Sequence, residues 1–409
     1  MTNEPSHFHT RTPQQSYNFD EIIDRRGTNA LKTDALKTRY GNPNLIPLWV
    51  ADMDFATPPF IIQALKKRIE HPIFGYTQES PGYRPAIIQW QKKLHNWNIQ
   101  PEWITYIPGI VKGIGLAINT LTKPGDNIII QPPVYPPFQT VPQNNGRTVI
   151  HNPLKPTPDG YQMDFDQLEQ MLTLGAKALI LSNPHNPSGT VWPRQTLATL
   201  AHLCAKHHTL VISDEIHADM TLFGHQHTPF ATASDTAAQN SITFAAPSKT
   251  FNIPGIVASF AVVPNPTIRT RFYTWLKANE LYTPNLFAAI ATEAAYTKGW
   301  EWRQELIKYL EQNTQYTTQY ITRHIPGIHV IPPQASFLVW LDCRNLHLSH
   351  QDLIHLFVHR AGLALNDGET FGPGGSGHMR LNIGTPRANL KKALQQLQKA
   401  NEELRTHNS

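Results

Sequence analysis

The sequence predicts an α/β fold: a mostly parallel sheet covered by helices, joined to a smaller α+β domain. Short apolar runs bounded by Pro, Gly and Asn alternate with segments that have the apolar spacing of amphipathic helices. Several of these runs are apolar along almost their whole length, which is typical of strands buried on both faces of a parallel sheet. After Pro264 the pattern changes to long helices and an alternating run, which indicates the second domain.

Six apolar runs are expected to form strands of the sheet: 127–131, 148–152, 178–182, 209–213, 242–245 and 259–263. Helical spacing predicts helices at 59–70, 83–97, 165–173 and 194–208. Farther along we expect helices at 268–277 and 285–324, strands at 337–341 and 379–383, and a closing helix from Ala388. The alternation implies helical crossovers between parallel strands.

Length and composition suit a protein of two or more domains, since 409 residues with 40% apolar content can bury a substantial core. We expect a disordered leader at 1–16, a large domain at 58–284, and a small domain built from 17–57 together with 285–409. The polar N-terminus lacks the basic-then-apolar order of a signal peptide, and no apolar run approaches a membrane span in length. A cytoplasmic protein without a membrane anchor is therefore expected.

Charge and cysteine usage argue against several classes of function. The formal net charge is +5 with no long basic run, so no nucleic-acid partner is expected. Cys204 and Cys343 lie far apart and outside any CxxC, which argues against a disulfide framework or a zinc site. Among the 20 histidines no pair has a third ligand at metal-site spacing, so no metal centre is expected.

One lysine, Lys249, lies on a tight turn directly after the predicted strand 242–245. Desolvation at such a place lowers the pKa of the amine and makes it nucleophilic. A solvated loop lysine would be the ordinary interpretation of this residue alone. The residues at the ends of neighbouring strands favour the functional interpretation.

Asp214 and Asn186 follow two of the other predicted strands. A buried carboxylate at Asp214 requires a cationic partner, such as a protonated pyridine nitrogen, although a helix cap is the commoner role of an isolated Asp. The Pro-rich turn 183–189 holds Asn186 in a fixed orientation, although such turns are usually only structural. Because ligands of open α/β sheets bind beyond the carboxyl ends of the strands, these side chains are candidates for one site.

Two glycine-containing segments differ in what they predict. Segment 108–113 precedes a helix, so the amides of Ile110 and Val111 are placed to meet a phosphate at the helix N-terminus. Segment 372–377 resembles a dinucleotide-binding string but opens a strand instead of a helix. We interpret the second segment as a flexible loop.

Seven segments, taken in order, carry a family resemblance: 18–20 (NFD), 49–55 (WVADMDF), 74–77 (FGYT), 131–135 (QPPVY), 247–252 (PSKTFN), 284–287 (PNLF) and 379–383 (MRLNI). Together they resemble the fold type I pyridoxal-phosphate enzymes of the aspartate-aminotransferase-like family. They are most similar to the MalY/PatB branch, the cystathionine β-lyase-like carbon–sulfur lyases. The resemblance implies a seven-stranded sheet in the large domain, pyridoxal 5′-phosphate as cofactor, and a homodimer with shared active sites.

The same resemblance implies a role for each matching residue. Lys249 forms the internal imine and acts as the catalytic residue, Asp214 pairs with the pyridine nitrogen, and Asn186 meets the ring hydroxyl. Tyr135 stacks on the ring, and Arg380 holds the substrate α-carboxylate by two parallel hydrogen bonds. With Arg380, three further residues are expected to bind the substrate: Ala51, Asn186 and Tyr135.

Two departures from the broader family affect the predicted phosphate site. Ala246 and Val257 stand where many relatives have a phosphate-binding Ser or Thr and an Arg. The phosphate must therefore be held by the Ile110 and Val111 amides, by Ser248, and by Tyr76 of the neighbouring subunit. His217 stands where the broader family often has a Tyr that bonds the ring oxygen, and whether it touches the cofactor is open.

The implied reaction is β-elimination from a small amino acid: cystathionine, cysteine or an S-substituted cysteine, giving thiol, pyruvate and ammonia. In this reaction Lys249 removes the Cα proton as general base. One alternative is a class I/II aminotransferase, which uses the same residues. A second is a metabolite-sensing regulatory protein on the same scaffold, although nothing in the sequence identifies a surface for a protein partner.

Overall fold

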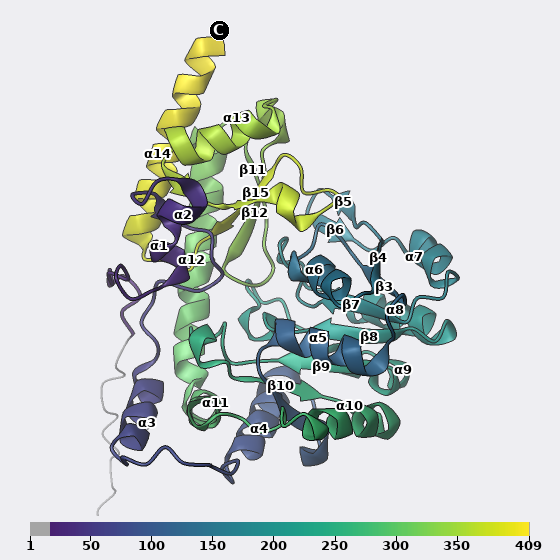
Figure 1. The fold of residues 1–409 in the computed structure, drawn as a ribbon. Helices are drawn as coiled ribbons and strands as arrows, with labels where there is room; N and C mark the ends of the chain where they lie inside the picture. Colours follow the sequence, from purple (N-terminus) through teal and green to yellow (C-terminus); the bar gives the residue numbers. More distant parts are fainter. Residues whose placement is uncertain (1–16, 409) are drawn as a thin grey trace, which may run out of the picture.

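A seven-stranded sheet lies at the centre of the chain, and the computed structural model describes residues 17–408 (Figure 1). The leader expected at 1–16 lies outside the described residues. The strands lie in the order β2 (Ile104–Ile107), β10 (Ser259–Val262), β9 (Ser241–Ala245), β8 (Leu210–Asp214), β7 (Ala178–Ser182), β3 (Asn127–Ile130) and β4 (Thr148–His151). β10 runs antiparallel to the other six strands, which are parallel to one another. The predicted mostly parallel, seven-stranded sheet is confirmed.

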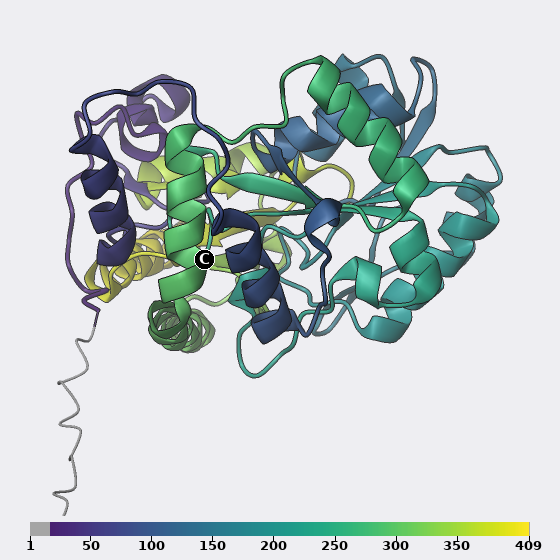
Figure 2. The same cartoon turned by 90° about the horizontal axis from the view of Figure 1, so that it is seen from below.

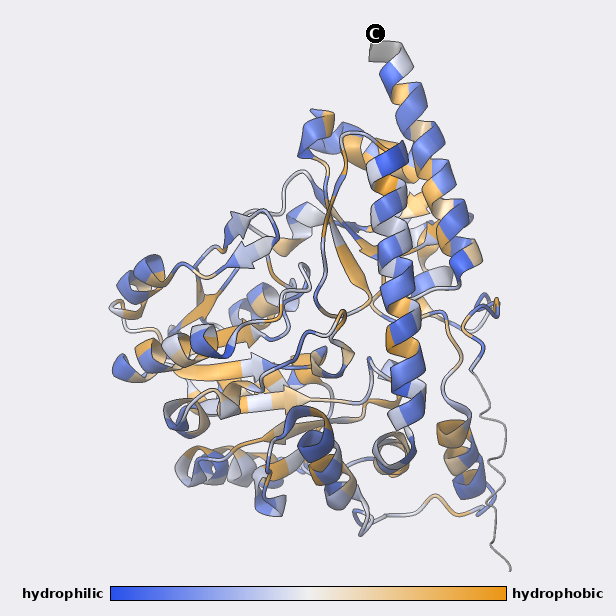
Figure 3. Cartoon of the chain, turned by 180° about the vertical axis from the view of Figure 1, so that it is seen from behind, coloured by the Kyte–Doolittle hydropathy of each residue, from blue (hydrophilic) through white to orange (hydrophobic). Residues whose placement is uncertain are grey.

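Helices cover both faces of this sheet because alternate strand residues point to opposite sides. Ile128 and Ile180 pack in one buried cluster with α5 (Ile110–Leu121), α6 (Pro137–Asn144) and α10 (Pro266–Ala278). Ile129 and Leu179, which directly adjoin these two residues in their strands, pack in another cluster with α7 (Phe165–Leu172) and α8 (Arg194–Lys206), and α9 (Asp235–Gln239) adds to that side. Figure 3 shows the strands in the colours of apolar residues between helices with polar outer faces.

A second, four-stranded antiparallel sheet lies in the C-terminal part of the chain. Its order is β11 (His329–Ile331), β12 (Leu338–Asp342), β15 (His378–Asn382) and β14 (Asn366–Asp367). The helices α12 (Trp300–His324), α13 (His350–His355) and α14 (Arg387–Asn408) belong to the same region, and α12 packs against both α14 and β11. The segment 372–377 leads into β15, as predicted.

The N-terminal segment joins this C-terminal region. It forms α1 (Leu31–Asp34), α2 (Leu36–Tyr40) and β1 (Ile46–Pro47), and β1 pairs in parallel with β13 (Leu363–Ala364). Leu36 and Leu45 pack in a buried cluster with Val358 and Ala364. Figure 1 accordingly shows the purple and yellow ends of the chain side by side. The domain limits at residues 57 and 284 remain a prediction.

The single helix expected at 285–324 is wrong, because the chain forms α11 (Leu286–Lys298) and α12 with a break at Gly299. A Cβ on Gly299 would lie 2.2 Å from the carbonyl oxygen of Ala295 and 2.3 Å from the ring of Phe251. Gly299 thus allows the ring of Phe251 to approach the backbone closely at the break, and the helical pattern of the sequence gives no sign of this. The break also lets α11 lie between α3 (Pro59–Ile69) and α4 (Tyr83–His95), as Figure 2 shows.

The remaining short elements are a hairpin, β5 (Lys155–Thr157) with β6 (Gly160–Gln162), and several 3-10 turns. Within residues 17–408, every helix is too short or too polar to cross a lipid bilayer.

Candidate active site

The carboxyl ends of β7, β8 and β9 meet at one edge of the central sheet. Asn186 lies on the turn after β7, Asp214 is the last residue of β8, and Lys249 lies four residues beyond the end of β9. These three strands are neighbours and run parallel. The sheet therefore brings together the three residues that the sequence placed on separate strand ends.

The amine of Lys249 is partly buried and donates a hydrogen bond to the carbonyl oxygen of Ala51 at 2.5 Å. Burial lowers the pKa of Lys249 to about 8, and the charge of Arg380 acts in the same direction. The carboxylates of Asp52 and Asp214 oppose this effect. The amine is thus much closer to its neutral, nucleophilic form at neutral pH than a solvated lysine.

Asp214 is a buried carboxylate without an ion-pair partner among residues 17–408. Its Oδ1 accepts a hydrogen bond from the backbone N–H of Ile216 at 3.0 Å. Burial raises the pKa of Asp214 to about 7, against the smaller effects of that hydrogen bond and of the Lys249 charge. A cationic group placed beside this carboxylate would restore its ionised form.

Arg380, on β15, is a buried guanidinium without a carboxylate partner in the described chain. Its Nη1 donates to Oδ1 of Asn186 at 2.9 Å, and its Nη2 donates to Oδ1 of Asn366 at 2.6 Å and to the Trp49 carbonyl oxygen at 3.2 Å. Its Nε has no hydrogen-bond partner. Burial lowers the pKa of Arg380 to about 10. A held guanidinium with an unused donor is suited to an incoming carboxylate.

Two further predicted residues lie among these charges. Burial raises the pKa of Tyr135, while Arg380 lowers it and Asp214 adds to the increase, so Tyr135 lies close to both. His217 makes a hydrogen bond through Nδ1 to Oγ of Ser336 at 3.0 Å. Burial, together with the charges of Lys249 and Arg380, lowers the pKa of His217 well below its usual value. His217 is therefore a neutral imidazole at the site.

The start of α5 lies at the same edge of the sheet. Strand β2 runs parallel to β9 because both are antiparallel to β10, and α5 begins at Ile110 three residues after β2 ends. Gly109 has φ 101° and precedes the free amides of the first helical turn. Val257 lies next to this turn, with its Cγ1 3.8 Å from where a Gly109 Cβ would be. Because the Val257 side chain is apolar and cannot bind an anion, an anion here would be bound by the helix amides and by buried Ser248.

Tyr76 is the one predicted site residue that the chain does not bring to the others. It lies on the loop between α3 and α4 and is fully exposed, and no contact joins it to the rest of the site within residues 17–408. In a single chain its side chain meets only solvent.

Sequence reasoning missed three asparagines that shape the site. Asn366 holds Arg380, and its strand β14 has only two residues, too few for a strand pattern. Asn252 and Asn382 bind the backbone of segment 49–55. Both lie within the segments that carry the family resemblance, which is the only signal that pointed to them.

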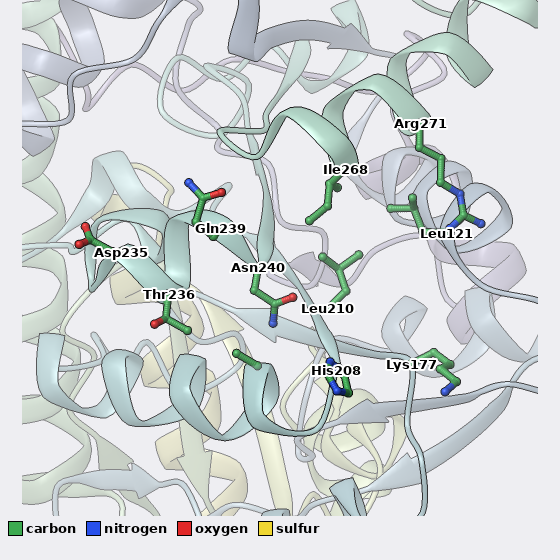
Figure 4. A pocket seen from close by; sticks show the side chains of 11 residues that line it. Leu121, Lys177, His208, Leu210, Asp235, Thr236, Gln239, Asn240, Ile268 and Arg271 are labelled. Carbon is green, nitrogen blue, oxygen red and sulfur yellow. The ribbon is translucent and has the colours of Figure 1, made fainter.

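One surface cavity is not part of this arrangement. It has a volume of about 670 Å³ and is lined by residues that include Lys177, His208, Asn240 and Arg271 (Figure 4). Lys177 and Asn240 directly precede β7 and β9, so the cavity lies at the amino ends of the strands. Lys249 and Asp214 lie at the opposite ends.

The residues at the sheet edge fit a group that carries an aldehyde, a ring cation and a phosphate. The Lys249 amine can take up an aldehyde carbon, the unpaired Asp214 carboxylate requires a cation, and the start of α5 accepts an anion. These are the functional groups of pyridoxal phosphate.

Known proteins resemble this chain over almost its whole length. Residues 43–397 match the family model for aminotransferase class I and II. The cystathionine beta-lyase PatB of Bacillus subtilis (strain 168) is 43% identical over 384 residues, covering 94% of this chain and 99% of PatB. Protein MalY of Escherichia coli (strain K12) is 32% identical, covering 92% and 97%. The crystal structure of cystalysin from Treponema denticola, which contains pyridoxal 5′-phosphate, has a TM-score of 0.92 at 33% identity, covering 95% and 100%.

Proposed function

The chain belongs to the aminotransferase class I and II family, and we propose that it is a pyridoxal-phosphate-dependent lyase that cleaves the Cβ–S bond of a cysteine-derived amino acid. The resemblance to this family seen in the sequence is thereby confirmed. Cystathionine is the substrate class suggested by the name of PatB. The products would be a thiol, pyruvate and ammonia, with one water consumed in releasing the ammonia.

One observation carries the proposal most directly: an unpaired, buried Asp214 carboxylate and the partly buried Lys249 amine lie together at the carboxyl edge of the sheet. When bound, pyridoxal phosphate draws electrons away from the substrate Cα, and the protein supplies orientation and charge. The Asp214 carboxylate favours a protonated ring nitrogen and thereby strengthens this withdrawal.

Lys249 is the proton carrier in this proposal. Its Nζ takes the proton from the substrate Cα, since a pKa of about 8 makes the amine a competent base near neutral pH. The same Nζ holds the cofactor when no substrate is present. The Ala51 carbonyl oxygen, 2.5 Å away, fixes the direction of the amine.

Arg380 orients the substrate through its α-carboxylate. Its Nη1 and Nη2 are held by Asn186, Asn366 and the Trp49 carbonyl oxygen, so the guanidinium plane is fixed before the substrate arrives. A substrate carboxylate would take the unused Nε and share the neighbouring Nη donor. Tyr135 would cover one face of the cofactor ring, and neutral His217 would pack beside it.

A second copy of the chain would complete the phosphate site. The Ile110 and Val111 amides and Ser248 supply no cation, and Tyr76 projects fully exposed from its loop. A homodimer in which Tyr76 of one subunit reaches the phosphate of the other accounts for that exposure. We place this dimer in the cytoplasm, with an amino acid as substrate and no metal.

The decisive experiment separates elimination from amino transfer. Purified holoenzyme given cystathionine should release pyruvate and thiol in equal amounts, while alanine with a keto-acid acceptor should transfer its amino group far more slowly. The Lys249→Ala variant measures the background. Amino transfer without thiol release would support the aminotransferase alternative. The absence of both reactions would support a metabolite-sensing role on this scaffold.

A further inference from the structure

Segment 49–55 forms one wall of the candidate active site without being a helix or a strand. Its Trp49 carbonyl oxygen accepts a hydrogen bond from Arg380 at 3.2 Å, and its Ala51 carbonyl oxygen accepts one from Lys249 at 2.5 Å. Both of the principal cationic side chains of the site are thus aimed by backbone oxygens of this segment. Its Asp54 N–H donates to the Gly384 carbonyl oxygen at 2.8 Å, and side-chain contacts must hold the rest of the segment.

Asparagine side chains hold part of the segment. Asn382 Nδ2 donates to the carbonyl oxygens of Val50 and Asp52 at 2.6 and 2.7 Å. Asn252 accepts from the Met53 N–H at 3.0 Å and donates to the Met53 and Phe55 carbonyl oxygens at 2.9 and 2.7 Å. These hydrogen bonds satisfy backbone N–H and carbonyl groups of the segment, but all of them join uncharged groups.

A compact cluster of two cations and two anions lies on the other side of the segment; it comprises Arg25, Lys32, Asp52 and Asp54. Arg25 binds Asp52 at 2.6 Å and Asp54 at 2.9 Å, and Lys32 Nζ lies 3.0 Å from Asp54 Oδ1 and 3.7 Å from Asp52 Oδ1. Lys32 Nζ also donates to the Asp52 carbonyl oxygen at 3.1 Å. The Lys32 side chain is 0% exposed and the two carboxylates about 15%.

The balance of this cluster makes it sensitive to the loss of one member. Two cations offset two carboxylates, so removal of one cation leaves an uncompensated, largely buried charge on the segment itself. Such a charge favours conformations in which Asp52 or Asp54 reaches water. Any of these would displace the Ala51 carbonyl oxygen, which lies one residue before Asp52.

We propose that the ion cluster Arg25–Lys32–Asp52–Asp54 is a positioning device, which fixes segment 49–55 so that Trp49 and Ala51 aim Arg380 and Lys249. Arg25 and Lys32 touch neither substrate nor cofactor and act only through the segment. The effect on turnover rests on the proposed lyase function, whereas the effect on the mobility of the segment does not.

The test compares two Lys→Met variants of the holoenzyme. Lys32→Met removes a buried partner of a carboxylate, and Lys206→Met removes the exposed partner of Glu169, which lies at 2.6 Å on the surface. Amide hydrogen exchange of peptides covering 49–55 reports on the segment, through the Met53 and Asp54 N–H groups, and peptides covering β8 report on the core. Substrate kinetics give kcat and KM for both variants.

In Lys32→Met, exchange of the segment should rise about tenfold or more while β8 is unchanged, because a local opening free energy lowered by about 1.4 kcal/mol gives that factor. The KM should rise and kcat should fall, since the Trp49 and Ala51 carbonyl oxygens no longer hold Arg380 and Lys249 in a fixed orientation. Lys206→Met should match the wild type in all three measurements.

Unchanged exchange and kinetics in folded Lys32→Met would overturn the proposal, as would equal increases in exchange at the segment and at β8. If Lys32→Met does not fold, Arg25→Met takes its place with the same two outcomes, since Arg25 is partly exposed. Wild-type protein without lyase activity would refute the proposed function but leave the exchange contrast as a valid test of the positioning device.

Discussion

Arg380 and Asn186 are 194 positions apart in the chain, yet Nη1 of Arg380 donates to Oδ1 of Asn186 at 2.9 Å. The bond joins β15 of the four-stranded sheet to the turn after β7 of the central sheet. The Arg380 guanidinium, proposed to hold the substrate carboxylate, is therefore fixed relative to the turn that carries Asn186, which is proposed to meet the cofactor ring. Substrate and cofactor positions are coupled through this one contact.

Replacement of Arg380 by Lys keeps a positive charge but loses the planar fork. We expect KM for the amino acid substrate to rise about 100-fold, since hydrogen bonds to charged groups contribute about 1.5–3 kcal/mol and the fork makes two of them. Steady-state kinetics measure this, with exposed Arg360→Lys as the control. An unchanged KM would show that the carboxylate is bound elsewhere.

Asn366→Ala tests whether Arg380 has to be held. The 2.6 Å bond from Arg380 Nη2 would be lost without any change in the charge of the site. KM should rise by about tenfold with kcat nearly constant, because one hydrogen bond to a charged group is removed. The same kinetics on Asn42→Ala, an exposed asparagine on the surface, provide the baseline. A selective fall in kcat would mean that Asn366 acts on the reacting atoms instead.

Much of the central sheet could be predicted because its strands are buried on both faces. The six predicted strands are all present within two residues of their expected ends. The seventh, β2, escaped because its four residues include Thr105 and Tyr106 and so lack a continuous apolar run. It was expected only from the family resemblance.

The site was predictable to the extent that strand ends carry it. Asp214 and Lys249 could be predicted from two buried strands, because Asp214 is the last residue of β8 and Lys249 lies on the turn four residues after β9. The contacts of Asn366 and Lys32 do not, since they depend on how the N-terminal and C-terminal segments pack together, and local sequence carries no record of that. Tyr76 is a further case, because its proposed partner is another chain.

Lys249→Ala should abolish turnover while leaving the fold intact. Loss of the base that moves the Cα proton is expected to lower kcat by about 100-fold or more. The visible absorbance of the lysine-bound cofactor should vanish, although pyridoxal phosphate should still bind through its phosphate. Absorbance spectra and pyruvate assays check both points. Persistence of the lysine-bound spectrum would assign the cofactor to another amine, and Lys277→Ala serves as the matched control.

Asp214→Asn should change how stability depends on pH in protein stripped of cofactor. The folded-state pKa of Asp214 is raised to about 7, against about 4 in the unfolded chain. The stability that this group contributes is fully present below pH about 4 and is lost as pH rises towards about 7, because only the unfolded state ionises in that window. The variant lacks this loss.

Thermal unfolding of both proteins from pH 4.5 to 7.5 measures the effect. The Tm of Asp214→Asn relative to wild type should increase steadily across this range. Added pyridoxal phosphate should remove the advantage of the variant, since a ring cation then stabilises the wild-type carboxylate. A difference in Tm that is independent of pH would show that Asp214 is already ionised in the cofactor-free protein.

Tyr76→Ala and Lys249→Ala should complement each other when mixed, if Tyr76 serves the site of the neighbouring subunit. In a mixed dimer, the subunit that keeps Lys249 would receive an intact Tyr76 from its partner. Random reassortment of equal amounts makes about half of the dimers mixed, each with one intact site, so activity should recover to about a quarter of wild type. Mixing Lys249→Ala with Arg380→Ala supplies the control, because both residues lie in one subunit and every mixed site carries a defect. If the Tyr76 mixture stays as inactive as its components, Tyr76 does not act across a dimer, and its exposure requires another explanation.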